Sequence, residues 1–167
     1  MKLYFRDNFF SSGVTDILNE QEEKVGHLDL KSAFSSKIDI AGEDGQLLYH
    51  GRFPFFSGKW HITDGNGERV GILRSRFSFF KKKYSYDTAG RGSYEIVSPA
   101  FSREYDIFDH TGTRVARFEK VNGWFSSGAF LLDNQSDQLD AFELVAVVMG
   151  MHAMQKNQSA AASNAAH

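Results

Sequence analysis

The chain has 167 residues, of which 41% are hydrophobic and 24% are charged. This composition is typical of one globular domain that buries a substantial core. The formal net charge is -2 and the sequence pI is about 6.3. No global positive field therefore favours nucleic acid as a partner, and any site for an anion has to be local.

The chain carries no features of a secreted protein. It contains no cysteine, which excludes a disulfide framework. Its first residues, MKLYFRDNFF, lack the continuous apolar segment of a signal peptide. We therefore expect a cytoplasmic protein, and one that is peripheral to the membrane if it binds lipid.

After a first predicted strand, Lys2 to Phe10, the chain repeats a hairpin pattern. The final glycines of four turns fall 22, 23 and 22 residues apart. These turns are Gly42-Glu43-Asp44-Gly45, Asp64-Gly65-Asn66-Gly67, Asp87-Thr88-Ala89-Gly90 and Asp109-His110-Thr111-Gly112. In Asp-x-x-Gly the carboxylate accepts backbone hydrogen bonds, and the glycine takes the positive φ that closes a hairpin. Residues 17–26 align with residues 62–71 without the glycines, which indicates a degenerate first copy.

Alternating apolar residues flank these turns, as expected for strands with one buried face. Ile38 with Ile40 and Trp60 with Ile62 are examples. Five hairpins give ten strands, and the leading segment and a trailing one at 129–132 bring the count to about twelve. With no helical pattern between the strands, this spacing predicts an antiparallel sandwich or barrel.

One later run, Leu139 to Met154, has apolar residues on every face of a helix. Its uninterrupted apolar part, Leu144 to Met151, would be about 12 Å long, which is too short for a bilayer core of about 30 Å. We therefore expect a helix buried in protein. Ser136 or Asp137 is expected to cap its first turn, and Gly150 to mark a close approach to a strand.

The geometry of a barrel allows such a helix inside it. Twelve strands about 4.8 Å apart and tilted about 40° close with a backbone radius of roughly 12 Å. Inward side chains then leave a hole about 14 Å across, and a helix with side chains is about 10–12 Å wide. The expected fold is therefore all-β with one buried helix, a closed antiparallel barrel of about twelve strands that encloses a hydrophobic C-terminal α-helix. This single domain covers 1–156, and 157–167 is expected to be a disordered tail.

The repeated unit reads WHITDGNGERVG at 60–71 and YDIFDHTGTRVA at 105–116, and the buried run ends in FELVAVVMGMHAM. In these motifs the chain resembles the LURP-one-related and tubby C-terminal-like proteins, which include small bacterial members of about this length. The resemblance covers nearly the whole chain, and it implies a twelve-stranded barrel around a hydrophobic C-terminal helix. It brings no catalytic residue. For function it implies phosphoinositide head-group binding, as in tubby proteins, or a relation to phospholipid scramblases, which share the fold.

No pattern of residues points to catalysis or to a metal. The six histidines show neither a zinc spacing nor an H-E-x-x-H pair. Asp64 to Glu68 opens like a calcium loop, but Arg69 and Ser75 stand where Gly and Glu are needed. We therefore predict no cofactor, no metal and no catalytic residue.

One charged cluster suggests a binding site. Within ten residues the chain carries Arg74, Arg76, Lys81, Lys82 and Lys83, interleaved with Phe77, Phe79 and Phe80. Cations beside exposed rings on neighbouring strands can hold phosphate groups while the rings reach a membrane interface. These five cations are the candidate site for an anionic phospholipid or phosphoinositide head group. The alternative is a solvated hairpin whose lysines protect a sheet edge.

Three classes of function stay open on the sequence alone. A non-catalytic binding or scaffold protein is favoured, because the chain's own helix is expected to occupy the barrel and no catalytic constellation is visible. A scramblase-like lipid handler is weakened by the missing cysteines for palmitoylation and the missing spanning segment. An enzyme with a loop-borne site is the third class.

Overall fold

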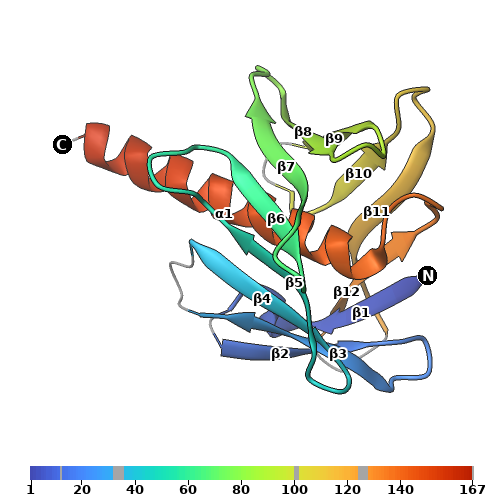
Figure 1. Ribbon diagram of the computed structural model, residues 1–167. Helices are drawn as coiled ribbons and strands as arrows, with labels where there is room; N and C mark the ends of the chain where they lie inside the picture. The colour runs from blue at the N-terminus through green and yellow to red at the C-terminus, as the bar shows by residue number, and fades with distance from the viewer. Residues whose placement is uncertain (12, 32–35, 100–101, 124–127, 167) are drawn as a thin grey trace.

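The computed structural model describes residues 1–11, 13–31, 36–99, 102–123 and 128–166. In this part of the chain twelve antiparallel strands form a closed barrel, as predicted, and one long helix follows the last strand (Figure 1). The strands are β1 (Lys2–Arg6), β2 (Gly13–Leu18), β3 (Lys24–Leu30), β4 (Lys37–Gly42), β5 (Leu47–Arg52), β6 (Trp60–Asp64), β7 (Arg69–Arg76), β8 (Lys81–Thr88), β9 (Ser93–Pro99), β10 (Tyr105–Phe108), β11 (Arg114–Val121) and β12 (Ala129–Asn134). A 3-10 helix, η1 (Asp7–Phe10), follows β1, where the sequence suggested a longer first strand. The α-helix α1 covers Ala141–Ala165.

The barrel closes through the first and last strands of the chain. β1 pairs with β12 from Lys2↔Asp133 to Arg6↔Ala129, and it contacts β2 through Tyr4 and Leu18. The remaining strands pair with their neighbours in sequence, as the hairpin repeat predicts. Closure removes the exposed edges that an open sheet would present.

The core lies between the inner face of the barrel and α1. Alternate residues of a strand face the interior, and Ile40, Ile62 and Ile107 are fully buried there. The apolar residues of α1 from Leu144 to Met151 are at most 3% exposed, so the predicted buried helix is confirmed. In Figure 1, α1 runs among the strands and its C-terminal part projects beyond them.

One tryptophan fixes the depth of the helix. The ring of Trp60 on β6 is fully buried, and its Nε1 donates a hydrogen bond to the carbonyl of Ala146 at 3.1 Å. A Cβ added at Gly150 would lie 2.5 Å from this ring, and one added at Gly51 of β5 would lie 2.6 Å from it. The close approach predicted at Gly150 is confirmed, and both glycines make room for the same ring.

The helix begins later than predicted. Asp140 is the N-cap, and its carboxylate accepts hydrogen bonds from two backbone N–H groups, of Phe142 at 2.8 Å and of Glu143 at 3.2 Å. The expected cap at Ser136 or Asp137 is wrong, because Asn134 Nδ2 donates to the carbonyl of Leu139 at 2.7 Å and folds the intervening residues into a turn.

The helix also ends later than predicted. It continues to Ala165, whereas a disordered tail was expected after Lys156. The segment 157–165 is rich in alanine, the strongest helix former. It extends a helix whose earlier turns are already formed and buried, so no new helix has to be nucleated. Within the described residues, no helix combines the length and the apolar character needed to cross a bilayer.

The two ends of the barrel differ in character. At what we call the turn end, tight polar turns join β2 to β3, β4 to β5, β6 to β7, β8 to β9 and β10 to β11, and α1 begins. At what we call the loop end lie the β5–β6 loop (residues 53–59) and the β7–β8 loop (residues 77–80). α1 emerges there, since Gln158 Nε2 donates to Ser75 Oγ at 3.3 Å.

The turn motif acts as expected in most copies. One carboxylate oxygen of Asp64 accepts two backbone hydrogen bonds at 2.9 Å, and Asp109 does the same at 2.8 and 3.0 Å. In the third copy Thr88 takes this role, with its Oγ1 accepting from a backbone N–H at 3.0 Å. Asp87 instead pairs with Arg74, so Thr88 stands in this turn where Asp64 and Asp109 stand in theirs.

Candidate functional site

The five cations predicted as a site lie on the β7–β8 hairpin at the loop end, but not on one face. Arg76 lies opposite Lys83 in the strand register, and successive residues of a strand point to opposite faces. Lys82 is on the inner face, in line with the buried rings of Tyr84 and Tyr86. The other four cations are on the outer face.

Two of the outer cations are already paired. Arg74 forms an ion pair with Asp87, and Lys83 Nζ lies 3.1 Å from Glu95 Oε1 on β9. Such partly exposed pairs contribute about 0–1 kcal/mol to stability, yet they cancel most of the local field. Arg74 and Lys83 therefore attract an outside anion weakly.

Lys82 is bound to the emerging helix. Its Nζ donates to the carbonyl of Ser102 at 3.1 Å and to Gln155 Oε1 of α1 at 3.2 Å. Burial, followed by the charge of Arg103, lowers the pKa of Lys82. The charged form of this amine is thus desolvated, and a nearby anion would stabilise it.

Arg76 and Lys81 have no carboxylate partner within the described part of the chain. Arg76 Nε donates to Ser85 Oγ at 3.0 Å, and the Lys81 side chain extends into solvent. Four cations nevertheless line one pocket of about 230 Å³, together with Ser75, Ser78 and Gln158: Arg76, Lys81, Lys82 and Lys83. The structure therefore brings four of the five predicted residues together and leaves Arg74 outside.

The rings in the loop between these strands are exposed. Phe77 and Phe79 are each 83% exposed, and Phe80 is 87% exposed. Phe77 and Phe79 meet edge to face, with centroids 4.8 Å apart. The interleaved pattern thus gives three solvent-facing rings in the loop that joins the two basic strands, and Phe77 also lines the pocket.

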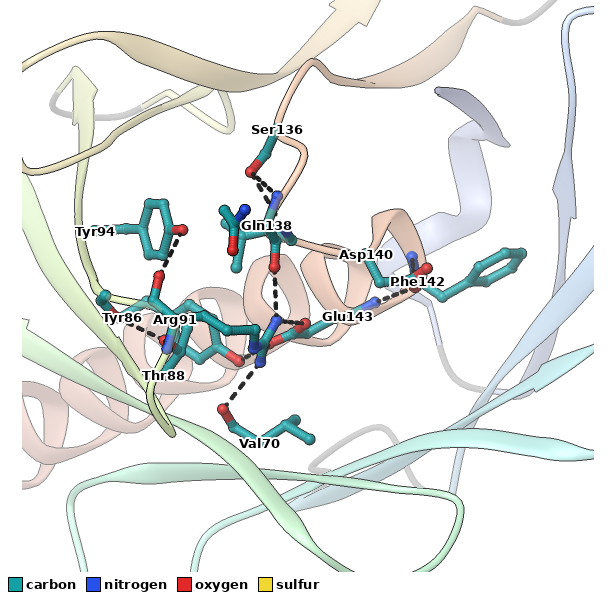
Figure 2. A network of polar contacts seen from close by, with 12 residues as sticks. Val70, Tyr86, Thr88, Arg91, Tyr94, Ser136, Gln138, Asp140, Phe142 and Glu143 are labelled. Atoms are coloured by element: carbon teal, nitrogen blue, oxygen red, sulfur yellow. Dashed lines mark hydrogen bonds and ion pairs between the residues drawn. The ribbon is translucent and has the colours of Figure 1, made fainter.

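A second polar cluster, which the sequence did not reveal, lies at the turn end. Figure 2 shows Arg91, from the β8–β9 turn, pointing at Glu143 in the first turn of α1. The two guanidinium nitrogens donate to the two carboxylate oxygens at 2.7 and 2.8 Å, and the Tyr86 hydroxyl donates to the same carboxylate. Arg91 also donates to the carbonyls of Gln138 at 2.9 Å and Val70 at 3.2 Å.

This cluster is arranged for holding the helix. Glu143 is 1% exposed, and a buried carboxylate is tolerated only when it is paired. Burial, and then the charge of Glu143, raises the pKa of Tyr86, so this phenol stays protonated and donating at neutral pH. A pocket of about 430 Å³ opens beside Arg91, next to Tyr49 and Asp140. Because the donors and acceptors of the cluster satisfy one another, we assign it the task of fixing α1 in the barrel.

One signal in the sequence could have revealed the cluster. Glu143 is a single acidic residue within an apolar helix, so its burial demands a cationic partner. The sequence offers no way to choose Arg91, which stands 52 residues away.

A third polar region surrounds the point where α1 leaves the barrel. A pocket of about 480 Å³ there is lined by residues that include Arg103, His152 and Lys156. His152 Nε2 is buried and has no hydrogen-bond partner among the residues that the structure describes, and its ring packs on Phe10 at 4.4 Å between centroids. Burial, followed by the charges of Lys156, Arg103 and Lys82, lowers the pKa of His152 to about 4. Within the described residues, no three His, Asp or Glu side chains converge as a metal site.

Together these features define a class of protein, a closed β-barrel built around its own C-terminal helix. The chain belongs to the LURP-one-related family, whose model matches residues 1–151. A solved structure of an Arabidopsis thaliana protein is similar in fold, with a TM-score of 0.60, 10% sequence identity, and coverage of 90% of this chain and 91% of that one. No curated protein sequence matches the chain. The family and its tubby-like fold support a binding or scaffold role in general, and the family is generally non-catalytic.

Proposed function

We propose that the protein is a non-catalytic binding protein that recognises the phosphate of an anionic phospholipid or phosphoinositide head group, and so acts at a membrane surface. The observation that carries this proposal is the pocket of about 230 Å³ lined by Arg76, Lys81, Lys82 and Lys83. Lys and Arg side chains that line one small pocket can donate hydrogen bonds to the oxygens of a phosphate.

The distribution of charge partners supports the proposal. Arg76 and Lys81 lack a carboxylate partner within the described residues, and Lys82, which also lines the pocket, donates from its amine to Gln155 of α1. Each cation near an anionic membrane contributes about 1 kcal/mol, so the pocket supplies a few kcal/mol. Attachment through it should be weak, reversible and sensitive to salt.

The strand pairing speaks against the alternative in which the lysines protect a sheet edge. Lys81 lies opposite Pro99, and Lys83 lies opposite Val97, so both belong to the β8–β9 ladder of a closed barrel. Charges that guard against strand pairing are expected on strands that lack a neighbour. Strand β8 is already paired with β9 along this segment, so protection of a free edge does not explain why the cations are clustered here.

Sedimentation with vesicles tests the proposal. The protein should bind phosphatidylcholine vesicles that contain phosphatidylserine or a phosphoinositide, and should not bind phosphatidylcholine alone through this pocket. Arg76→Gln with Lys81→Gln removes two cations and should weaken binding to anionic vesicles about thirtyfold at low salt. The matched control is Lys2→Gln with Lys24→Gln, which removes two charges paired with Glu20 and Asp16 at the turn end. Equal losses in both double variants, or no preference for anionic vesicles, would refute the proposal.

A further inference from the structure

The exposed phenylalanines in the described part of the chain lie at one end of the barrel. All five in the described part of the chain lie in two loops, with Phe55 90% and Phe56 101% exposed in the β5–β6 loop, and Phe77, Phe79 and Phe80 in the β7–β8 loop. Large rings normally provide the core of a protein, and contiguous exposed apolar surface marks an interaction site.

The two loops are neighbours at the loop end. β5, β6, β7 and β8 are consecutive strands of the barrel, and both loops connect strands at the end where α1 emerges. The β6–β7 pair lies between the two loops, and β7 continues to Arg76, three residues beyond Leu73, the partner of Trp60 at the start of β6. The rings form one contacting group in each loop, and we call the five together the aromatic rim.

One of the rings is held at a cost to the backbone. Ser57 N–H donates to the carbonyl of Pro54 at 3.1 Å, which closes a turn with Phe56 at its third position. Phe56 has a φ of 55°, a left-handed conformation that favours Gly or Asn at this place in a turn. Its ring is fully exposed and touches mainly Phe55, with centroids 4.9 Å apart. Within the described residues, no packing or hydrogen bond of the Phe56 ring compensates for this backbone strain. We therefore expect the ring to contact a partner outside the protein.

The surroundings of the rim identify its partner. Residues 53–59 and 77–80 contain no Asp or Glu. The first loop includes Lys59, and the second is flanked by Arg76 and Lys81. Apolar rings beside cations, without carboxylates, are the composition that settles at the interface of an anionic bilayer. The rings also stand at two separate loop tips. A fluid bilayer interface can take up each ring independently, so it does not need the rings to form one continuous surface.

We propose that the aromatic rim inserts into the bilayer interface while the basic pocket holds a head group beside it. This inference rests on the proposed function and adds to it the β5–β6 loop, which carries no part of the basic pocket. Binding then has two parts. The part from Arg76 and Lys81 is weakened by salt, whereas the part from Phe55 and Phe56 is not.

The test compares vesicle binding of the full chain and of variants at low and high salt. Phe55→Ala with Phe56→Ala removes two rings without changing charge, and it should weaken binding about tenfold or more at either salt concentration. Leu47→Ala is the control, because Leu47 is an exposed apolar residue at the turn end. Circular dichroism and melting temperature confirm that each variant is folded. In a second measurement, Phe55→Trp should gain fluorescence that is quenched by brominated acyl chains.

The outcomes separate the two proposals. Binding that prefers anionic vesicles but is unchanged by Phe55→Ala with Phe56→Ala would overturn the rim and leave the basic pocket intact. Binding that is lost in this variant but shows no preference for anionic vesicles would support the rim and reject the head-group pocket. Absence of vesicle binding rejects both. Concentration-dependent dimers that disappear in the same variant would mean that the rim contacts a second copy of the chain, and would also overturn the inference.

Discussion

Arg91 and Glu143 connect the β8–β9 turn to the first turn of α1 through two hydrogen bonds of 2.7 and 2.8 Å. Glu143 is almost fully buried, whereas Arg91 keeps contact with solvent. A carboxylate in this position depends on its partner, because a buried charge without one costs several kcal/mol. The position of α1 in the barrel therefore depends on the β8–β9 turn, which supplies Arg91 as the partner of Glu143.

Arg91→Ala should destabilise the fold by about 3 kcal/mol or more, because it leaves the buried carboxylate of Glu143 uncompensated. Urea unfolding measures this loss. Adding Glu143→Gln to the variant should recover part of the stability, since the buried charge is then gone. Arg114→Ala is the control, because its pair with Asp106 at 3.3 Å is largely exposed and should cost only about 0–1 kcal/mol. Equal effects of the two single substitutions would contradict the role assigned to Arg91.

His152 should make stability depend on pH. Its pKa is lowered from the ordinary 6.5 to about 4, by burial first and then by Lys156, Arg103 and Lys82. Between these two pH values His152 is protonated in the unfolded chain but neutral in the folded chain. The contribution of the neutral His152 to stability is therefore fully present above about pH 6.5 and is lost as the pH falls towards 4.

The variant His152→Leu isolates this contribution. Thermal unfolding across the same pH range should show a shallower acid loss than in the native chain, with a difference on the order of 2 kcal/mol near pH 4. At pH 7 the variant should be at least as stable, because the unpartnered Nε2 is removed. Parallel pH profiles for the two proteins would show that His152 does not titrate in this way.

Gly150→Ala should destabilise the protein although alanine is the better helix former. The new Cβ would lie 2.5 Å from the Trp60 ring, and overpacking of this kind costs about 1–3 kcal/mol against a gain in helix propensity of about 1 kcal/mol. Denaturant melts with tryptophan fluorescence report on the same contact. Gly58→Ala, whose Cβ meets open space, is the matched control and should be nearly neutral. A more stable Gly150→Ala protein would mean that the ring moves aside without cost.

Phe56→Gly should make the protein more stable and a poorer membrane binder. Glycine accepts the φ of 55° without strain, which gains about 1–2 kcal/mol against an entropic cost of about 0.5–1 kcal/mol. Melting temperature and vesicle sedimentation, measured on the same preparation, give the two readouts. A lower melting temperature would show that the Phe56 ring supports the fold and is not held out for a partner.

The architecture was predictable because it is repeated in local signals. The Asp-x-x-Gly turns, the alternation around Ile40 and Ile62, and the all-round apolar helix each determine structure within a few residues. Closure of the sheet into a barrel was predictable because about twelve strands enclose a space as wide as a helix with its side chains. The errors at the helix ends are also local: Asn134 delays the start by a tertiary hydrogen bond, and alanine propensity extends the end.

The site was harder to predict because it depends on partners far apart in sequence. The cluster of cations is visible in the chain, but the pairing of Lys83 with Glu95 and of Lys82 with Gln155 is not. Strand alternation does hold one usable signal. Tyr84 and Tyr86 had to face inward, and the same period places Lys82 on the inner face.

Closure of the barrel has a consequence for the order of folding. Met1 and Asn134 exchange two backbone hydrogen bonds, at 2.7 and 2.9 Å, across 133 residues of chain. Strand pairs so far apart in sequence lose the entropy of loop closure before their hydrogen bonds and packing can stabilise them, and this slows folding. During synthesis β1 therefore has to wait for β12. The ring of strands closes around α1, which follows β12 in the chain, so the hairpins that emerge first keep unpaired strand edges until both of these segments have been made.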